Sequence, residues 1–174
     1  MIILGIDPGM ATTGYAVVHL HSMDMRFNPG TENNVLDYGV ISTKPSQGNG
    51  DRLQEIYEGV RELIDKYQPQ VMAVESLFFY NNQKTAMMVG QARGVVLLAG
   101  NQAGLEIYDY TPKQVKQAVV GYGVAKKNQV QFMVKNIFCL EDIPRPDDAA
   151  DALAVCYCHG MQIGARSSVP VQNN

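Results

Sequence analysis

Residues 2–18, I-I-L-G-I-D-P-G-M-A-T-T-G-Y-A-V-V, set the beginning of the predicted fold. A short apolar run ends in the acid Asp7, and Pro8-Gly9 then turns the chain. Residues 14–18 predict a second strand, and residues 35–43 predict a third with partial alternation of apolar and polar residues. Three consecutive strands of this kind indicate an antiparallel meander.

The rest of the chain alternates helices with strands. Apolar residues at spacings of three and four over residues 53–67 predict an amphipathic helix that Pro69 ends. The run V-M-A-V-E at 71–75 has no polar alternation, as expected of a central strand covered on both faces. Further elements are predicted as a helix over 82–103, a strand over 105–110, and helices from Thr111-Pro112 to Gly121, over 126–138 and over 147–159. This order predicts one α/β domain over residues 1–160 and a polar tail at 161–174.

The composition bounds the class of protein. A chain of 174 residues with 46% hydrophobic and 18% charged residues is typical of one globular domain. No apolar run reaches the roughly 18–20 residues of a membrane span, and the start M-I-I-L-G-I-D does not resemble a secretory signal. The three cysteines are few and odd in number, and the C-x-C-H run at 156–159 is interpreted as small buried side chains rather than a metal site. We therefore expect a cytoplasmic protein with no membrane partner.

The charge is unevenly distributed. The net charge is −3, yet residues 111–140 contain five lysines and no acid, so this segment carries +5 and the rest −8. A local basic stripe on an acidic protein is typical of a phosphate-binding face. A solvated lysine-rich surface would have the same charge, and the sequence leaves both interpretations open.

Four acids could form one site. Asp7 and Glu75 end predicted central strands, and α/β sheets bind ligands at the carboxyl ends of their strands. Asp148 and Asp151 are three residues apart on the last predicted helix and share a face. Asp147 is rotated by roughly 100° from Asp148, in the first turn where an acid interacts favourably with the helix dipole.

Carboxylates gathered from three segments repel one another unless a cation joins them. Mg²⁺ prefers carboxylate oxygens, and two such ions about 3.5–4 Å apart can activate a water and stabilise a leaving oxygen. Asp7 and the D-x-x-D pair also have ordinary interpretations, because an Asp after a strand often forms a turn and a D-x-x-D pair can cap a helix. Glu75 is the stronger candidate, because a charge at the end of a buried strand needs a partner. Spacing alone does not show that the segments converge.

Six motifs resemble those of the RuvC family of bacterial Holliday-junction resolvases, in the family's order and over nearly the whole chain. They are G-I-D-P-G at 5–9, T-G-Y-A-V-V at 13–18, V-E-S-L-F at 74–78, G-Q-A-R-G-V at 90–95, K-Q-V-K-Q-A-V-V-G-Y-G at 113–123 and D-A-A-D-A-L-A at 148–154.

The resemblance implies an RNase H-like α/β fold, with a five-stranded mixed sheet flanked by helices and its first three strands antiparallel. It implies a homodimer, with the helix over 82–103 at the interface, that nicks a four-way DNA junction in a paired and symmetric way. The products would carry 5′-phosphate and 3′-hydroxyl ends, in recombination and repair. A branch-migration complex of the RuvA and RuvB kind is the implied partner.

The family's functional residues carry over by motif. The catalytic and Mg²⁺-binding acids fall on Asp7, Glu75, Asp148 and Asp151, with two ions expected per subunit and Mn²⁺ as a substitute. Asp147 lies outside the pattern. The DNA-binding residues fall on Lys116, Lys127 and the aromatic Phe78, for which a core position is the ordinary alternative. Residues 19–34 look longer and more polar than the family's usual turn.

Two other classes of function stay open at this point. The first is a protein that binds junctions without cutting them, against which the presence of all four acids argues. The second is a nucleotide-binding protein of the actin or sugar-kinase type, whose first strand also leads into an Asp and a Gly-rich turn. That fold needs two lobes, and 174 residues are too few for them.

Overall fold

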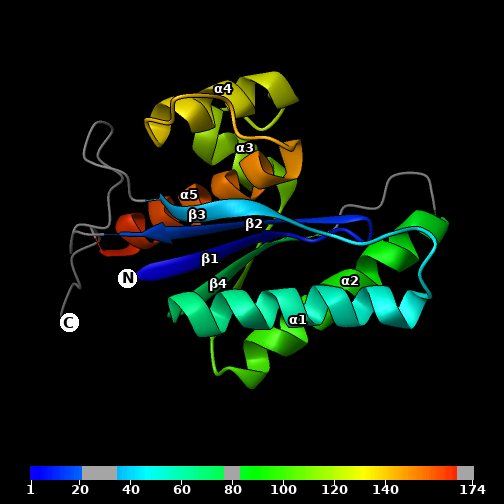
Figure 1. The fold of residues 1–174 in the computed structure, drawn as a ribbon. Coiled ribbons are helices and arrows are strands. Elements are labelled where there is room, and N and C mark those ends of the chain that lie inside the picture. Colours follow the sequence, from blue (N-terminus) through cyan, green and yellow to red (C-terminus); the bar gives the residue numbers. More distant parts are fainter. Residues whose placement is uncertain (21–34, 77–82, 168–174) are drawn as a thin grey trace.

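The fold is a five-stranded mixed sheet with helices on both faces (Figure 1). The structure is a computed structural model that describes residues 1–20, 35–76 and 83–167. The strand order is β3-β2-β1-β4-β5, which confirms the predicted α/β class. Phe78 and most of the 19–34 segment lie outside the described residues.

The first three strands form the predicted antiparallel meander. Strand β1 (Ile2–Asp7) pairs with β2 (Thr12–His19), and β2 pairs with β3 (Val35–Ser42). Strand β4 (Val71–Glu75) then lies parallel to β1 on its other side, and β5 (Glu106–Tyr110) lies parallel to β4. The two acid-ended strands, β1 and β4, are therefore direct neighbours at the centre of the sheet.

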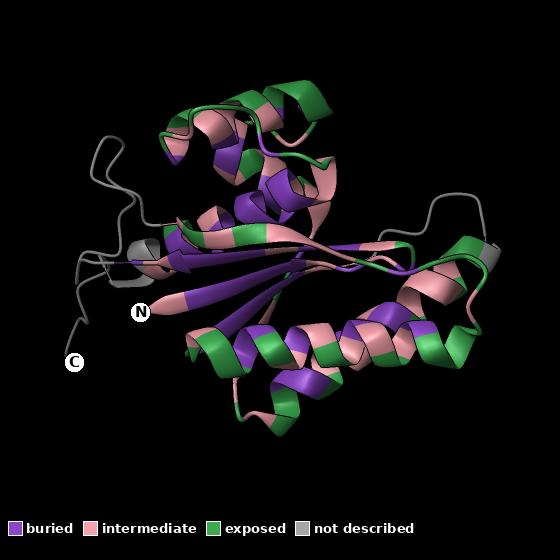
Figure 2. Ribbon diagram, viewed as in Figure 1, coloured by how far each residue is buried: buried purple, intermediate pink, exposed green. Residues whose placement is uncertain are grey.

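Each face of the sheet has its own hydrophobic core. Helices α1 (Asn49–Tyr67) and α2 (Gln83–Gln102) cover one face. Helix α5 (Asp147–Ser167) covers the other, and α3 (Pro112–Val120) and α4 (Lys127–Ile137) pack on α5 (Figure 1). Figure 2 shows the buried central strands between helices whose outer sides are exposed. Burial on both faces explains why V-M-A-V in β4 has no polar alternation.

Local signals explain where the helices begin and end. Thr111 caps α3 as predicted: its hydroxyl accepts from Gln114 N, and the Gln114 side chain accepts from the Thr111 backbone in a capping box. Helix α3 ends at Gly121, whose φ of 90° suits glycine. Helix α1 ends at Gln68, just before Pro69, with the Gln68 N–H bonded to Ile64 O.

Helix α5 is longer than predicted. It continues past His159 to Ser167 and so crosses the boundary at residue 160 that the sequence suggested. The added residues contain glycines but no proline, and a glycine lowers helix stability without ending a helix. Cys156 and Cys158 are buried within α5, as the interpretation of the C-x-C-H run predicted. Of the helices described, none is long and apolar enough to cross a membrane.

Candidate active site

The strand register brings Asp7 and Glu75 to one edge of the sheet. Ile6 of β1 pairs with Val74 of β4 in the parallel ladder, so the next residue on each strand is an acid. Asp7 also pairs across β1 and β2 with Gly14. Neighbouring parallel strands end at the same side, and this geometry explains why two acids 68 positions apart in the chain become neighbours.

Close packing of α5 on the sheet brings Asp148 and Asp151 to the same edge. Ala149, Ala150 and Ala152 are fully buried, and short side chains let the helix approach the strands. Gly14 supports this approach, because a Cβ there would overlap the backbone carbonyl of Asp148. One turn deeper, a Cβ on Gly5 would lie 2.6 Å from the Ala152 carbonyl oxygen. The start of α5, with Asp148 and Asp151, is therefore held against the ends of β1 and β2.

The acids and Lys127 form one electrostatic unit. Burial raises the pKa of Asp7 well above its usual range, and the negative charges of Glu75, Asp151 and Asp148 add to the rise. Burial also raises the pKa of Glu75 to about 7, again with a contribution from Asp151. The pKa of Asp151 is raised by burial, which outweighs the opposing effect of the Lys127 ammonium. The folded protein thus holds several carboxylates where their charge is unfavourable.

Lys127 contacts the two acids at either end of the first turn of α5. Its Nζ lies 3.1 Å from Asp151 Oδ2 and 3.6 Å from Asp147 Oδ2. Burial lowers the pKa of Lys127, but Asp151 and the neighbouring acids outweigh that effect and raise it, so the ammonium stays charged. The sequence interpretation assigned Lys127 to DNA phosphates. It gave no sign of this contact with the acids, because the contact joins α4 to α5 through tertiary packing.

Two hollows flank the acids. One, of about 200 Å³, is lined by Glu75 and Asp151 together with Lys116 and Lys127. The other, of about 350 Å³, includes Asp148 and lies along the turn between β1 and β2. Asp148 and Asp151 lie one turn apart on α5 and line different hollows. The structure thus places the predicted Lys116 and Lys127 beside the acids, whereas Phe78 lies outside the described residues.

The donors suit a hard divalent cation. Carboxylates that raise one another's pKa are stabilised by a positive ion, and their oxygens are the ligands that Mg²⁺ prefers. Within the ranges that the structure describes, no three His, Cys, Asp or Glu side chains are gathered closely enough to hold a metal ion. Lys127 instead provides the positive charge at Asp151.

Comparison with known proteins places the chain in a family. A family model described as "Crossover junction endodeoxyribonuclease RuvC" matches residues 3–159. Proteins of that name from Halothermothrix orenii and Natranaerobius thermophilus are 54% and 51% identical to the chain. The first alignment covers 92% of both chains, and the second covers 96% of this chain and 99% of the relative.

Solved structures agree with this result. The structure of Thermus thermophilus RuvC superposes with a TM-score of 0.82 at 37% identity, covering 96% of each chain. The same protein in complex with a Holliday junction substrate gives a TM-score of 0.86 at 36% identity, over 98% of this chain and 99% of that one. The yeast mitochondrial resolvase Ydc2 shares the fold, with a TM-score of 0.64 at 13% identity. The architecture is the RNase H-like fold that the resemblance implied, and the chain belongs to the RuvC family of crossover junction endodeoxyribonucleases.

Proposed function

We propose that this protein is a structure-selective endonuclease that resolves four-way DNA junctions by paired, symmetric nicks. One observation carries the proposal: within a RuvC-family chain, the charges of Glu75, Asp151 and Asp148 all act on buried Asp7, and Glu75 and Asp151 share a hollow with Lys116 and Lys127. Relatives at about half identity bear the name of crossover junction endodeoxyribonuclease, and a solved relative was captured with a Holliday junction substrate. Its role would be in recombination and repair.

The four acids would hold the divalent metal, which we propose to be Mg²⁺, two ions per subunit, with Mn²⁺ able to substitute. When bound, the metal supplies an activated water and charge stabilisation for the leaving oxygen of a phosphodiester. Lys116 and Lys127 would orient the DNA backbone, since both line the hollow that contains Glu75 and Asp151. Phe78 would stack on an unpaired base near the crossover.

The assembly around this domain is also part of the proposal. Two copies related by a two-fold axis would place two identical sites on the near two-fold junction, which accounts for paired nicks. Residues 1–160 would form the nuclease domain and residues 161–174 a tail, although α5 continues to Ser167. A cytoplasmic location and cooperation with a branch-migration complex of the RuvA and RuvB kind fit the family.

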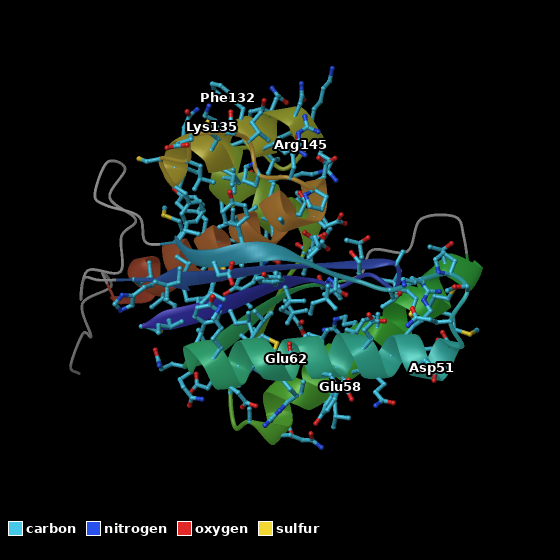
Figure 3. The ribbon with its side chains drawn as sticks, viewed as in Figure 1. Asp51, Glu58, Glu62, Phe132, Lys135 and Arg145 are labelled. Carbon is cyan, nitrogen blue, oxygen red and sulfur yellow. The ribbon has the colours of Figure 1, made fainter. Side chains whose placement is uncertain are left out.

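The test is cleavage of a synthetic four-way junction beside a linear duplex, with and without Mg²⁺, and with the products mapped on all four strands. We expect nicks on two strands of like polarity, with 5′-phosphate ends, on the junction only. Asp7→Asn should keep junction binding and lose nicking. Glu62→Gln, an exposed acid on the outer side of α1, is the matched control and should nick normally (Figure 3). Binding without nicking by the unmodified protein, or normal nicking by Asp7→Asn, would overturn the proposal.

A further inference from the structure

A buried arginine lies beneath the turn that follows Asp7. Arg52 belongs to the first turn of α1 and is only 7% exposed. Its Nε donates to Thr43 Oγ1 at 2.8 Å, and the Thr43 hydroxyl donates to Met10 O at 2.6 Å. The Thr43 backbone N–H also bonds to Ala11 O. This chain of bonds fixes the guanidinium against the β1–β2 turn.

The charge of Arg52 has no acidic partner among residues 1–20, 35–76 and 83–167, where no carboxylate lies within ion-pair distance of it. In the same ranges, its one hydrogen bond uses a single N–H of the five that a guanidinium carries. The two Nη nitrogens of Arg52 are not among the buried, unpartnered atoms of the described residues, so they reach solvent and are open to an anion. An arginine held in this way is therefore suited to a ligand that brings negative charge.

Arg52 lines the second of the two hollows described above, a groove of about 350 Å³. The groove is bounded by the turn residues 9–12 on one side and by α2 on the other, and its full lining is Gly9, Met10, Ala11, Thr12, Arg52, Thr85, Met88, Val89 and Asp148. Arg52 is the one cation among these lining residues, beside the backbone of the turn and the side chains of Thr12 and Thr85.

The position of the groove indicates which anion. Asp148, one of the four proposed metal ligands, is part of its lining, so the groove adjoins the acids directly. Lys116 and Lys127 line the hollow on the side of Asp151. A hollow that contains at least one cationic side chain thus lies on each side of the acids, where the phosphates on either side of the cut bond would need one.

We propose that this groove is a second phosphate subsite, in which Arg52 binds a backbone phosphodiester of the cleaved strand next to the scissile bond. The proposal rests on the endonuclease function proposed above and assigns Arg52 a binding role in it. The planar fork of a guanidinium donates two parallel hydrogen bonds to a phosphate, which lysine does not. The Arg52–Thr43 bond fixes that fork in place before the strand arrives.

Binding is measured first, in the Asp7→Asn background, so that no cutting occurs. Arg52→Gln should weaken junction binding about tenfold, as expected for losing a hydrogen-bonded charge contact. It should also flatten the slope of log affinity against log salt by about 0.7–0.9. Arg52→Lys should restore the slope but not the full affinity. Thr43→Val is the control, because it removes the same hydrogen bond and keeps the charge.

The second experiment locates the phosphate that Arg52 contacts. It uses junctions that each carry one neutral methylphosphonate at a different position along the cleaved strand. The nicking rate of the unmodified protein should fall sharply when the methylphosphonate stands at one position beside the scissile phosphate. At that position alone, the nicking rate of Arg52→Lys should fall by a smaller factor. Melting temperatures of all variants identify any that fail to fold, and Arg52→Lys then carries the comparison.

The outcomes separate the two proposals. If the unmodified protein does not nick the unmodified junction, the proposed function fails. If it nicks normally but no methylphosphonate position depends on residue 52, the subsite is wrong. Equal losses of affinity and salt slope in Arg52→Gln and Thr43→Val would also overturn it, because Arg52 would then act only by holding the turn.

Discussion

At the scale of single residues, the three aspartates of the P-D-D-A-A-D segment differ in what surrounds them. Asp151 is 25% exposed and lies 3.1 Å from Lys127 Nζ, whereas Asp147 is 48% exposed and lies 3.6 Å from the same atom. An exposed ion pair of the latter kind contributes about 0–1 kcal/mol. Lys127 therefore contacts both aspartates but is held mainly by Asp151.

Asp147→Asn should accordingly retain most nicking activity, and Asp148→Asn and Asp151→Asn should each lose it. Only the latter two belong to the group of acids that raise the pKa of Asp7. The measurement is the single-turnover rate of junction cleavage in Mg²⁺. A loss in Asp147→Asn as large as that in Asp151→Asn would show that Asp147 is part of the site.

The raised pKa values of the acids also predict how stability depends on pH. Glu75 has a pKa of about 7 in the folded protein against 4.5 for an ordinary glutamate, so the folded state holds its proton more tightly. The free energy of unfolding of the metal-free protein is therefore highest, as far as Glu75 contributes, below about pH 4.5. It falls as the pH rises from there through 7. At about 1.4 kcal/mol per pKa unit, the rise in the pKa of Glu75 accounts for at most about 3.5 kcal/mol.

Urea unfolding of the metal-free protein at pH 5, 6, 7 and 8 measures this effect. The unfolding midpoint should decline over that range, and Glu75→Gln should decline less because its neutral side chain does not ionise. Mg²⁺ should stabilise the unmodified protein more at pH 8 than at pH 5. A midpoint that is unchanged or rises between pH 5 and pH 8 would contradict the assignment.

At the scale of elements, the seam between α5 and the sheet sets the position of the acids. Gly14→Ala should destabilise the protein by about 1–3 kcal/mol, because its Cβ would overlap the Asp148 carbonyl and push the start of α5 outward. The same shift should lower nicking more than it lowers junction binding. Urea unfolding and cleavage rates measure the two effects.

Gly50→Ala is the matched control for Gly14→Ala. Gly50 lies in α1 with open space around its Cα, so alanine should leave stability unchanged or raise it by up to about 1 kcal/mol. Nicking should not change. If Gly14→Ala unfolded at the same urea concentration as Gly50→Ala, the close approach of α5 would not matter for stability.

The elements also show how far the sequence predicts this structure. Apolar periodicity, the Thr111-Pro112 start and the acid-ended strands predicted the order of strands and helices, because each signal is local. The convergence of Asp7, Glu75 and the start of α5 depends on strand register and on packing at Gly14, which spacing does not encode. The contact of Lys127 with Asp151 and the burial of Arg52 were missed for the same reason.

At the scale of the whole molecule, α1 differs in charge from α3 and α4, although α2 beside α1 carries two bases and no acid. Helices α3 and α4 come from the segment that carries five lysines and no acid, whereas α5, on the same face, begins with acids. Helix α1, on the opposite face, carries five acids against three bases. Figure 3 shows Lys135 and Phe132 on the outer side of α4, and Asp51, Glu58 and Glu62 on α1 across the sheet. This arrangement favours approach of DNA from the α3–α4 side.

Removing two exposed lysines from that side should therefore weaken junction binding and its dependence on salt. The variant is Lys113→Gln with Lys126→Gln, and both residues are exposed. Each phosphate contact that is lost should flatten the slope of log affinity against log salt by about 0.7–0.9. The matched control is Arg61→Gln with Lys66→Gln, which removes the same charge from α1. The two double variants have the same net charge. Equal changes in the slope of log affinity against log salt would therefore mean that total charge, rather than the α3–α4 face, determines binding.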